Sequence, residues 1–495
     1  MRTLLIVCAC LFSLVLFAQS GGSGVPSTAA QVTFNKHVLP ILQQKCQSCH
    51  RPGEAAPMSF LSYQTTRPWA RAMKTAVTTR KMPPGGLDPR YGHFLEDYTL
   101  TDKQIETIVN WADGGAVEGD PGDAPPPVQW VEGWRSKPDV VIEAPPFDVP
   151  ATGWVENLDI ILPTPFKRDA WVRTIEIRPG VPAVVHHAGV RFVPHRDGVK
   201  YGVPVWRDIK RDENGVHVPD QEKPALVSFC SDDSKKACPV DEKQFHGLNG
   251  GGGFDGFYRP GGTPLDYAYY GTAYLIPANS DIVINLHYNP NGRAVTDATK
   301  IGFTLAPEPA RQLRMVALSP RGRGGPGDRD NGSNELTERN NAAERAWFRI
   351  PAGDPNWLAP PADMLFDADT ELAVMSIHMH ERGKDMTYTL LYPDGRTEVI
   401  LNQPGYDFNW QMTYNLRNTI KIPKGTKLRV IAHYNNSASN RYNRNPNIDV
   451  YWGEQSWEEM MAPWVGLIVN RDVDLNKMLV RNPGDEKTFF ARIGK

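Results

Sequence analysis

The sequence predicts a multidomain chain, in which a small all-α domain precedes two all-β domains built as antiparallel sandwiches. In the segment expected to form the all-α domain, Val38, Ile41 and Leu42 follow the i, i+3, i+4 spacing of an amphipathic helix. After residue 121 the pattern changes to short runs rich in Val, Ile and aromatic residues, separated by Pro-Gly and Asp-Gly turns. The 43 glycines and 43 prolines also suit turn-rich β structure better than helical bundles.

The first residues predict export. Arg2 precedes the apolar run 4–17, which is followed by small residues, and this is the pattern of a cleaved signal peptide. No other stretch is long and apolar enough to span a bilayer, so a periplasmic or secreted protein without a membrane span is expected. The expected segments are a signal peptide (1–20), the helical domain (31–120), a proline-rich linker (121–145), a first β domain (146–310), a loop-rich linker (311–345) and a second β domain (346–495).

Charge and cysteine usage narrow the function classes. A formal net charge of −2 argues against nucleic acid or an anionic membrane as a partner. Of the six cysteines, two lie in the signal segment and two, Cys46 and Cys49, lie in a C-x-x-C-H motif. The remaining pair, Cys230 and Cys238, is expected to form a local disulfide rather than a metal site in an oxidising compartment.

Cys46-Gln-Ser-Cys49-His50 is a C-x-x-C-H motif. Its two thiols can reach both vinyl groups of one porphyrin, and the adjacent imidazole can take the proximal position on the iron. A structural disulfide, a redox C-x-x-C and half of a zinc site are the alternatives, although no second Cys/His pair lies nearby to complete a zinc tetrad. The motif therefore indicates a covalently bound haem c, and residues 31–120 resemble a small cytochrome c.

The helix pattern after the motif supports this interpretation, because Thr101 and Gln104 form a capping box ahead of a helix that should stop at Gly114. A thioether is the expected distal ligand, since it favours Fe(II). Met82, in a loop stiffened by prolines, is the first choice and Met58 the second, whereas Met73 is expected in the core.

His378 and His380 are the sharpest pair among the later histidines. In an expected strand, residues i and i+2 share one face, so both imidazoles can reach one metal ion. Ser376 and Val374 should share that face, with the opposite, core-facing side formed by Ala373, Met375, Ile377 and Met379. A solvated polar face is the alternative.

His186 and His187 are adjacent, so in a regular strand they would point to opposite faces. They can bind one metal only if a bulge or a strand end redirects one of them, and Gly189 could supply that irregularity. His287 lies late in another strand, where a lone histidine is more often a satisfied polar residue. Met460, beside Glu459, would by default be a core methionine.

Together these pieces resemble the copper type II, ascorbate-dependent monooxygenases, a family that includes peptidylglycine α-hydroxylating and dopamine β-monooxygenases. The order His-His, His, His-x-His, Glu-Met runs through roughly residues 150–470 and leaves the haem segment outside. The resemblance is closest in the last third, through His378–Lys384, Pro393–Arg396, Tyr406–Gln411, His433–Asn436 and Gly453–Met461.

The resemblance implies two jelly-roll-like sandwiches, each holding one copper, that face each other across a solvent-filled cleft. It implies that the electron-supplying copper is held by His186, His187 and His287. It also implies that His378, His380 and Met460 hold the catalytic copper, which binds dioxygen and faces the substrate. Imidazole accepts both copper oxidation states, while a thioether favours Cu(I).

Several positions depart from the peptide-amidating members. Ser376 stands where those enzymes carry an arginine that resembles a carboxylate anchor, and Ala462 and Trp464 replace their asparagine and tyrosine. A glycine-extended peptide is therefore an unsuitable substrate, and no anchor for a charged group can be chosen from the sequence. Trp464, Trp457 and Tyr406 would suit an apolar or aromatic substrate only if they line the cleft.

The leading hypothesis is an exported monooxygenase that hydroxylates a C–H bond of a small organic substrate with O2. Electrons from ascorbate or a periplasmic redox protein would pass through the haem and the three-histidine copper. The alternatives are an electron-transfer or copper-handling protein without oxygenase activity and a metal-free adhesive β protein. The remaining histidines are expected to be structural or exposed: His37, His93, His195, His217, His246 and His433.

Overall fold

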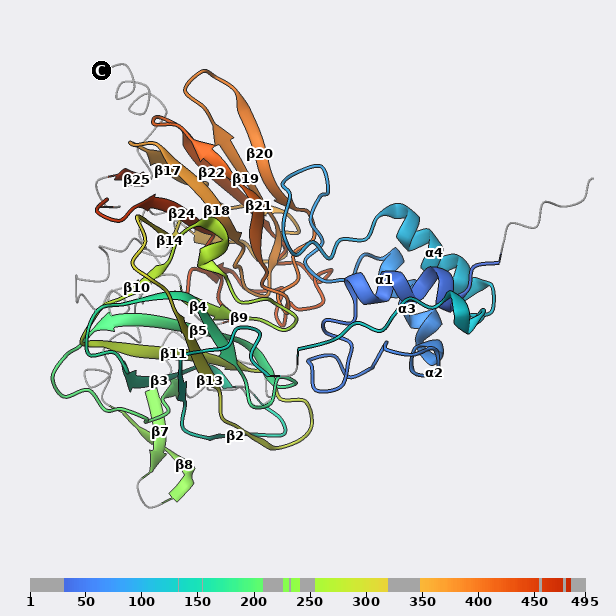
Figure 1. Cartoon of the computed structure of the whole chain (residues 1–495), viewed down its shortest axis with the longest axis horizontal. Helices are drawn as coiled ribbons and strands as arrows, with labels where there is room; N and C mark the ends of the chain where they lie inside the picture. The colour runs from blue at the N-terminus through green and yellow to red at the C-terminus, as the bar shows by residue number, and fades with distance from the viewer. Residues whose placement is uncertain are drawn as a thin grey trace, which may run out of the picture.

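The computed structural model describes residues 31–131, 133–153, 155–207, 226–230, 233–240, 254–318, 348–453, 456–474 and 478–481. The expected signal peptide, the Gly250–Gly253 loop, the Gly/Arg/Asn-rich tract 321–334, His217 and His246 lie outside these residues. Helices occupy one side of the molecule and strands form the rest (Figure 1). Among the described residues, no helix is long and apolar enough to cross a membrane.

The N-terminal helical region packs around its own apolar cluster, in which Phe34, Leu42, Ile108 and Trp111 are buried. Its capping box is confirmed: Thr101 Oγ1 accepts a hydrogen bond from Gln104 N at 3.2 Å, and Gln104 Oε1 accepts one from Thr101 N at 2.9 Å. Met73 is a core residue, as expected. The helices are η1 Phe34–Val38, α1 Leu39–Lys45, α2 Tyr63–Thr66, η2 Arg67–Trp69, α3 Ala70–Thr78, α4 Asp102–Asp113 and η3 Pro121–Asp123.

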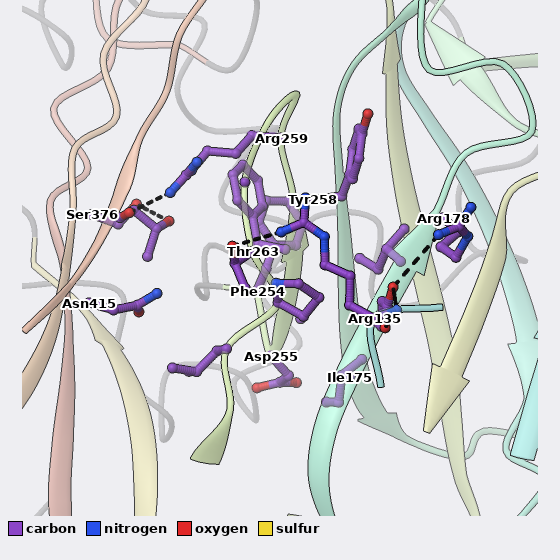
Figure 2. A pocket seen from close by; sticks show the side chains of 18 of the residues that line it. Arg135, Ile175, Arg178, Phe254, Asp255, Tyr258, Arg259, Thr263, Ser376 and Asn415 are labelled. Carbon is purple, nitrogen blue, oxygen red and sulfur yellow. Dashed lines mark hydrogen bonds and ion pairs between the residues drawn. The ribbon is translucent and has the colours of Figure 1, made fainter. Parts of the chain in front are cut away.

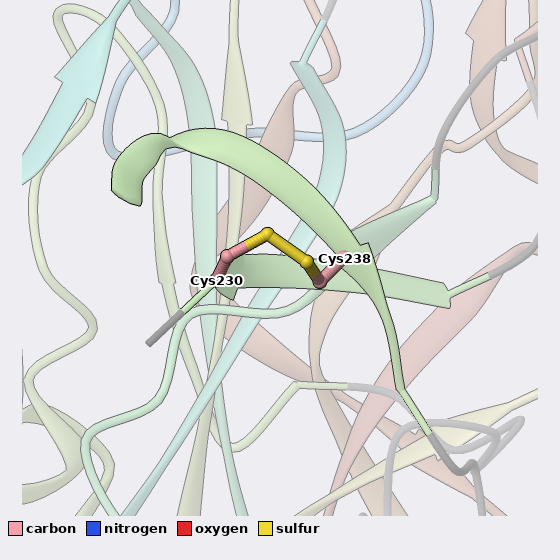
Figure 3. Close-up of a disulfide and its surroundings, with 2 residues drawn as sticks. All are labelled: Cys230 and Cys238. Atoms are coloured by element: carbon pink, nitrogen blue, oxygen red, sulfur yellow. A yellow bond between two sulfur atoms is a disulfide. The ribbon is translucent and has the colours of Figure 1, made fainter. Parts of the chain in front are cut away.

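The first β unit has two four-stranded antiparallel sheets, in the orders β1-β13-β4-β10 and β3-β11-β5-β9, which enclose one apolar core. Its strands are β1 Val140–Glu143, β2 Phe147–Val149, β3 Val155–Pro163, β4 Ala170–Arg178, β5 Val185–Pro194, β6 Trp206–Arg207, β7 Leu226–Cys230, β8 Asp233–Pro239, β9 Gly256–Tyr258, β10 Tyr274–Ile276, β11 Ser280–Tyr288, β12 Val295–Asp297 and β13 Lys300–Leu305, with a short helix η5 at Tyr267–Tyr270. The expected disulfide is present and joins Cys230 of β7 to Cys238 of β8 (Figure 3).

The second β unit pairs the sheet β14-β24-β18-β21 with the sheet β20-β19-β22-β17-β25. Its strands are β14 Arg311–Ala317, β15 Arg349–Ile350, β16 Trp357–Leu358, β17 Ala362–Phe366, β18 Thr370–Ser376, β19 Gly383–Leu391, β20 Thr397–Gln403, β21 Thr413–Ile422, β22 Lys427–Tyr434, β23 Val450–Tyr451, β24 Trp464–Asn470 and β25 Leu479–Arg481. Alternating burial along β22 and β19 reflects a sheet with one core-facing side.

Two expected linkers contain strands instead. β1 lies inside the expected linker 121–145 and pairs with β13 of the first unit. β14 opens the expected linker 311–345 and pairs along its whole length with β24 of the second unit. Both strands are recruited by edge pairing with distant strands, which local sequence does not encode.

The two β units pack directly against each other. Leu313, Val374 and Ile468 of the second unit belong to the same apolar cluster as the core of the first. Val374 and Ser376, expected on an open histidine face, are therefore buried like the opposite face of β18.

The segment that follows α3 crosses from the helical region to the second β unit, beside β20 and β21 (Figure 1). Phe94 forms an antiparallel bridge with Leu416, and Leu95 N donates to Asn415 O at 2.8 Å. Tyr414 donates from its hydroxyl to Gly85 O at 3.0 Å. The helical region is thus docked on the β units and not merely tethered by the proline-rich segment.

Candidate functional site

His186 and His187 lie at the start of β5, opposite the end of β11. The register places His287 opposite His187 and then Tyr288 opposite Val185, so His186 is the extra residue of a β-bulge. The irregularity that the sequence required is present, but at His186 and not at Gly189, which pairs regularly with Asn285. Gly189 instead makes room for the ring of Phe254, with which a Cβ would collide.

The bulge brings three imidazoles together. The ring centroids of His186 and His187 are 4.9 Å apart, and those of His187 and His287 are 4.0 Å apart. Burial lowers the pKa of all three rings, that of His287 to about 3, and repulsion from neighbouring histidines adds to the effect at His187 and His287. The rings are therefore neutral near pH 7, which is the form that binds a metal.

His378 and His380 lie just beyond the end of β18 and not inside the strand as expected. Their ring centroids are nevertheless 5.1 Å apart, with the rings nearly perpendicular. His378 Nδ1 is 2.6 Å from Gln411 Oε1, to which it can donate, so its Nε2 is the atom left to bind a metal. Burial lowers the pKa of His378 to about 4, and the bond to Gln411 only partly opposes this shift.

Glu459 organises the turn that carries His380. Its buried carboxylate accepts backbone hydrogen bonds from His380 N at 3.0 Å, Arg382 N at 2.5 Å and Met460 N at 3.3 Å. Burial raises the pKa of this carboxyl to about 8 despite the nearby Arg382 guanidinium. The Glu-Met pair of the sequence thus fixes the His380 turn and the Met460 backbone to each other.

The two adjacent methionines differ in burial. Met461 is fully buried in the core of the second unit, whereas Met460 is half-buried. Strand-like alternation predicts this difference, because neighbouring side chains face opposite ways.

The histidines of the two units meet at the interface between the units. Phe408 lies against His186 at 5.3 Å and His380 at 6.5 Å between ring centroids. Trp464 stacks on His378 at 5.9 Å, with an interplanar angle of 5°. The expected solvent-filled cleft is therefore replaced here by a packed contact of aromatic and imidazole rings.

The residues fit copper by type and surroundings. His186 Nε2 and His187 Nδ1 are buried and have no hydrogen-bond partner among the described residues, so each nitrogen is available to a metal. No three His, Cys, Asp or Glu side chains of the described residues converge on one metal position. Rotation about the side-chain bonds of the stacked His187 and His287 rings would be needed to bring their nitrogens onto one ion.

The haem-type motif lies at the end of α1. Cys46 and Cys49 are free thiols, and burial raises the pKa of Cys46 to about 12. His50 Nδ1 is 3.3 Å from Met58 O and can donate to it, which leaves Nε2 for an iron, as a haem ligand requires. Phe60 stacks on the His50 ring at 4.3 Å. Met58 therefore supplies a carbonyl contact to His50, while Met82 is half-buried with its N–H donating to Ala76 O at 3.1 Å.

The described histidines outside these groups have local partners or are exposed. His433 contacts Asp385 at 2.6 Å, His195 contacts Asp281 at 3.2 Å, and His37 Nδ1 accepts from Thr33 N at 3.0 Å. His93 is exposed. Of the aromatic residues considered for a substrate site, Tyr406 and Trp457 are buried, and Trp464 lines a cavity.

Sequence reasoning missed three groups around the histidines. Gln411 and Phe408 stand in a segment already noted for its resemblance, but only the fold shows that they contact His378 and His186. Arg259, which lines the same cavity as Trp464, carries no motif at all, and it is one of the three buried arginines among the described residues, with Arg191 and Arg382.

Two packed antiparallel β units thus gather histidines, a residue type that binds transition metals, at their interface. A family model described as the copper type II ascorbate-dependent monooxygenase, C-terminal domain, matches residues 364–465, the segment that contains His378, His380 and Met460. Residues 364–465 therefore match a domain of the copper type II, ascorbate-dependent monooxygenases, and this match supports a copper-dependent oxidoreductase.

The other comparisons add little. A solved structure described as recombinant N-glycanase F (PNGase F) is similar over 68% of this chain and 98% of that chain, with 9% sequence identity and a TM-score of 0.23. A TM-score of that size does not relate the two folds. No curated protein matches the chain.

Proposed function

We propose that this chain is an exported monooxygenase that hydroxylates a C–H bond of a small organic substrate with O2, using copper at two histidine groups and a covalent haem c. The family match over residues 364–465 supports the copper chemistry, and the remaining parts rest on the residues described above. The signal-type pattern of the first residues supports export to the periplasm or beyond the cell.

In this proposal His378, His380 and Met460 hold the catalytic copper. Copper bound there supplies the one-electron chemistry that activates dioxygen. Gln411 fixes the His378 ring and its tautomer through Nδ1, and Glu459 holds the His380 and Met460 backbones in one arrangement.

His186, His187 and His287 would hold the second copper, whose role is to supply electrons. The bulge at His186 is the feature that allows two adjacent imidazoles to serve one ion. The Phe408 ring, which contacts both His186 and His380, excludes water from the short path between the two groups.

Cys46, Cys49 and His50 would bind the haem, with Met82 as distal ligand. A haem held there supplies a store for one electron at a time from ascorbate or a periplasmic redox protein. The contacts between Phe94, Leu95 and β21 support a fixed position of this haem relative to the coppers.

The observation that carries the proposal is the meeting of five histidines from two β units, next to the match over residues 364–465. Metal analysis of the purified protein should find two coppers and one haem iron per chain, and a product screen with labelled dioxygen should find one labelled oxygen atom in the product. One copper per chain, or two coppers without oxygen uptake under reductant, would instead favour a copper-handling or electron-transfer protein.

A further inference from the structure

A cavity of about 120 Å³ lies where the two β units meet, close to the haem-type motif. Figure 2 shows Phe254 and Asp255, which line this cavity, between Arg135 and Arg178 on one side and Ser376 and Asn415 on the other. Glu54, a few residues after Cys49, closes the side towards the helical region. The cavity thus touches all three parts of the molecule.

Arg259 is the only arginine lining this cavity that is more than nine-tenths buried, with 6% of its surface exposed. One guanidinium nitrogen, Nη2, donates to Thr413 O at 2.6 Å and lies 3.7 Å from Glu96 Oε2. The other, Nη1, has no hydrogen-bond partner among the described residues. Leaving such a charged donor without an acceptor is costly, so a further acceptor is expected in the cavity.

Asn415 is likewise a buried polar side chain with one atom lacking a hydrogen-bond partner, but that atom is an acceptor. It is 5% exposed, its Nδ2 is 3.5 Å from Glu96 Oε2, and its Oδ1 lacks a partner within the described part of the chain. The carboxylates that line the cavity are already occupied. Glu176 accepts from Arg135 N and Ser136 N, Asp255 accepts from Phe192 N at 2.9 Å, and Glu54 pairs with Arg51 at 2.6 Å. The cavity therefore retains an unused cationic donor while its own anions are satisfied.

Aromatic side chains form part of the lining. Phe254 meets Trp464 edge-on at 5.7 Å, and Trp464 in turn stacks on His378. Empty apolar cavities of about 150 Å³ hold one benzene ring, so this cavity suits a molecule of one-ring size and not a peptide.

We propose that this cavity binds a small organic anion, with the Arg259 guanidinium as its anchor and the Phe254 and Trp464 rings as its apolar walls. Planar oxyanions such as carboxylates or enediolates match a guanidinium that can donate from two nitrogens. This inference rests on the proposed function only for the role of the anion, which is the substrate if it is a carboxylate and the reductant if it is an enediolate.

The test measures binding and not turnover. Benzoate and ascorbate are titrated separately, without oxygen, into the full-length protein before and after copper loading, with calorimetry and Trp fluorescence as readouts. One of the two should bind, and Arg259→Gln should weaken its binding by about tenfold to a hundredfold, the value of one lost charge-assisted hydrogen bond. Arg259→Lys keeps the charge but loses the planar fork, so it should recover only part of the affinity.

Arg178→Gln is the matched control, because Arg178 lines the same cavity but lies over the Trp134 ring and beside Glu176. It should bind the anion like the unchanged protein. Asn415→Asp gives a second route if Arg259→Gln does not fold, since a carboxylate of nearly the same shape beside Glu96 should repel the anion.

Benzoate binding alone identifies a carboxylate substrate, and ascorbate binding alone identifies the reductant. Binding of neither probe, or binding unchanged by both Arg259→Gln and Asn415→Asp, overturns the inference. Anion binding that depends on Arg259, in a protein that does not consume oxygen, would keep this inference and reject the monooxygenase.

Discussion

A single extra residue in a strand, His186, determines whether the first histidine group can act together. Without the bulge, His186 and His187 would point to opposite faces of the sheet, and only one of them could lie beside His287. The bulge thus brings two adjacent imidazoles close together, as the i, i+2 spacing does for His378 and His380.

The thioether assignment is tested by exchanging each methionine for isoleucine. Met460→Ile should lose copper from the His378 and His380 group and abolish oxygen uptake, because the soft ligand for Cu(I) is removed. The haem and the three-histidine copper should stay loaded. Met461→Ile, a core change, should cost about 1 kcal/mol of stability and keep the copper. Copper stoichiometry and oxygen uptake are the measurements, and an inactive Met461→Ile with an active Met460→Ile would reverse the assignment.

The buried histidines make the metal-free protein sensitive to acid. The unfolded chain binds protons near the ordinary histidine pKa of 6.5, whereas folded His287 and His378 bind them only near about 3 and about 4. The unfolded state binds more protons than the folded state in this window. The free energy of unfolding should therefore decrease as the pH is lowered from 6.5 to 4, by up to about 1.4 kcal/mol per pH unit for each histidine. Urea titrations at several pH values measure this slope. It should flatten in His287→Gln and His378→Gln, and a slope that both substitutions leave unchanged would contradict the burial argument.

For single residues, the sequence indicates which side chains are candidates for a site better than it indicates what those side chains contact. Spacing alone identifies Cys46, His378 and the disulfide partners, because each pattern is local. The roles of Arg259 and Gln411 depend on contacts between chain segments far apart in sequence, so no local pattern reveals them.

Among the elements, the segment that follows α3 has the largest effect on architecture. Its loop runs along β21, and Gly85 adopts a φ of +70° that side-chain-bearing residues rarely adopt. This segment, expected inside a self-contained helical domain, therefore serves as the docking surface of that region.

Gly85→Ala should loosen this docking. A Cβ there would lie 2.5 Å from Met412 Cγ in an unfavourable backbone conformation, at a cost of about 1–3 kcal/mol. Protease cleavage between residues 85 and 95 should become faster while the copper content stays the same. Gly86→Ala is the neighbouring control, because a Cβ at that position meets nothing within 4 Å. Equal cleavage rates for both variants would show that the loop is not held as described.

Element prediction succeeds where the determinant is local. The capping box of α4 fixes its start, and the helix ends at Gly114 as expected. β1 and β14 could not be found in this way, since each is recruited by a partner strand more than 100 residues away. The end of β18 before His378 likewise depends on the turn that Glu459 holds.

For the whole molecule, the docked helical region predicts that haem and copper act as one system. Cys46→Ala combined with Cys49→Ala should abolish haem attachment and lower turnover with physiological donors by about tenfold or more, since a fixed donor is lost. Copper stoichiometry should not change, because the histidine groups lie in other units. Haem absorbance, copper content and turnover are measured together, and unchanged turnover with every donor would remove the relay from the proposed function.

The global arrangement was the part least accessible to sequence. An antiparallel β architecture follows from the turn-rich composition, but the packed contact of Phe408 and Trp464 between the two histidine groups does not. Because Val374 and Ile468 belong to an apolar core shared by both units, we expect the two units to fold cooperatively.

On the haem proposal, the contact between Gly261 and Cys49 would also impose an order of events on biogenesis. The loop after β9 covers the Cys49 sulfur so closely that even a Cβ at Gly261 would collide with it, and Tyr98 fastens that loop by donating to Gly261 O at 3.0 Å. A maturation enzyme that joins a porphyrin to this thiol must therefore act while the loop is still absent or open. On the haem proposal, the N-terminal region is modified first as a nascent, accessible segment, and closure of the β units then seals the linkage from the outside.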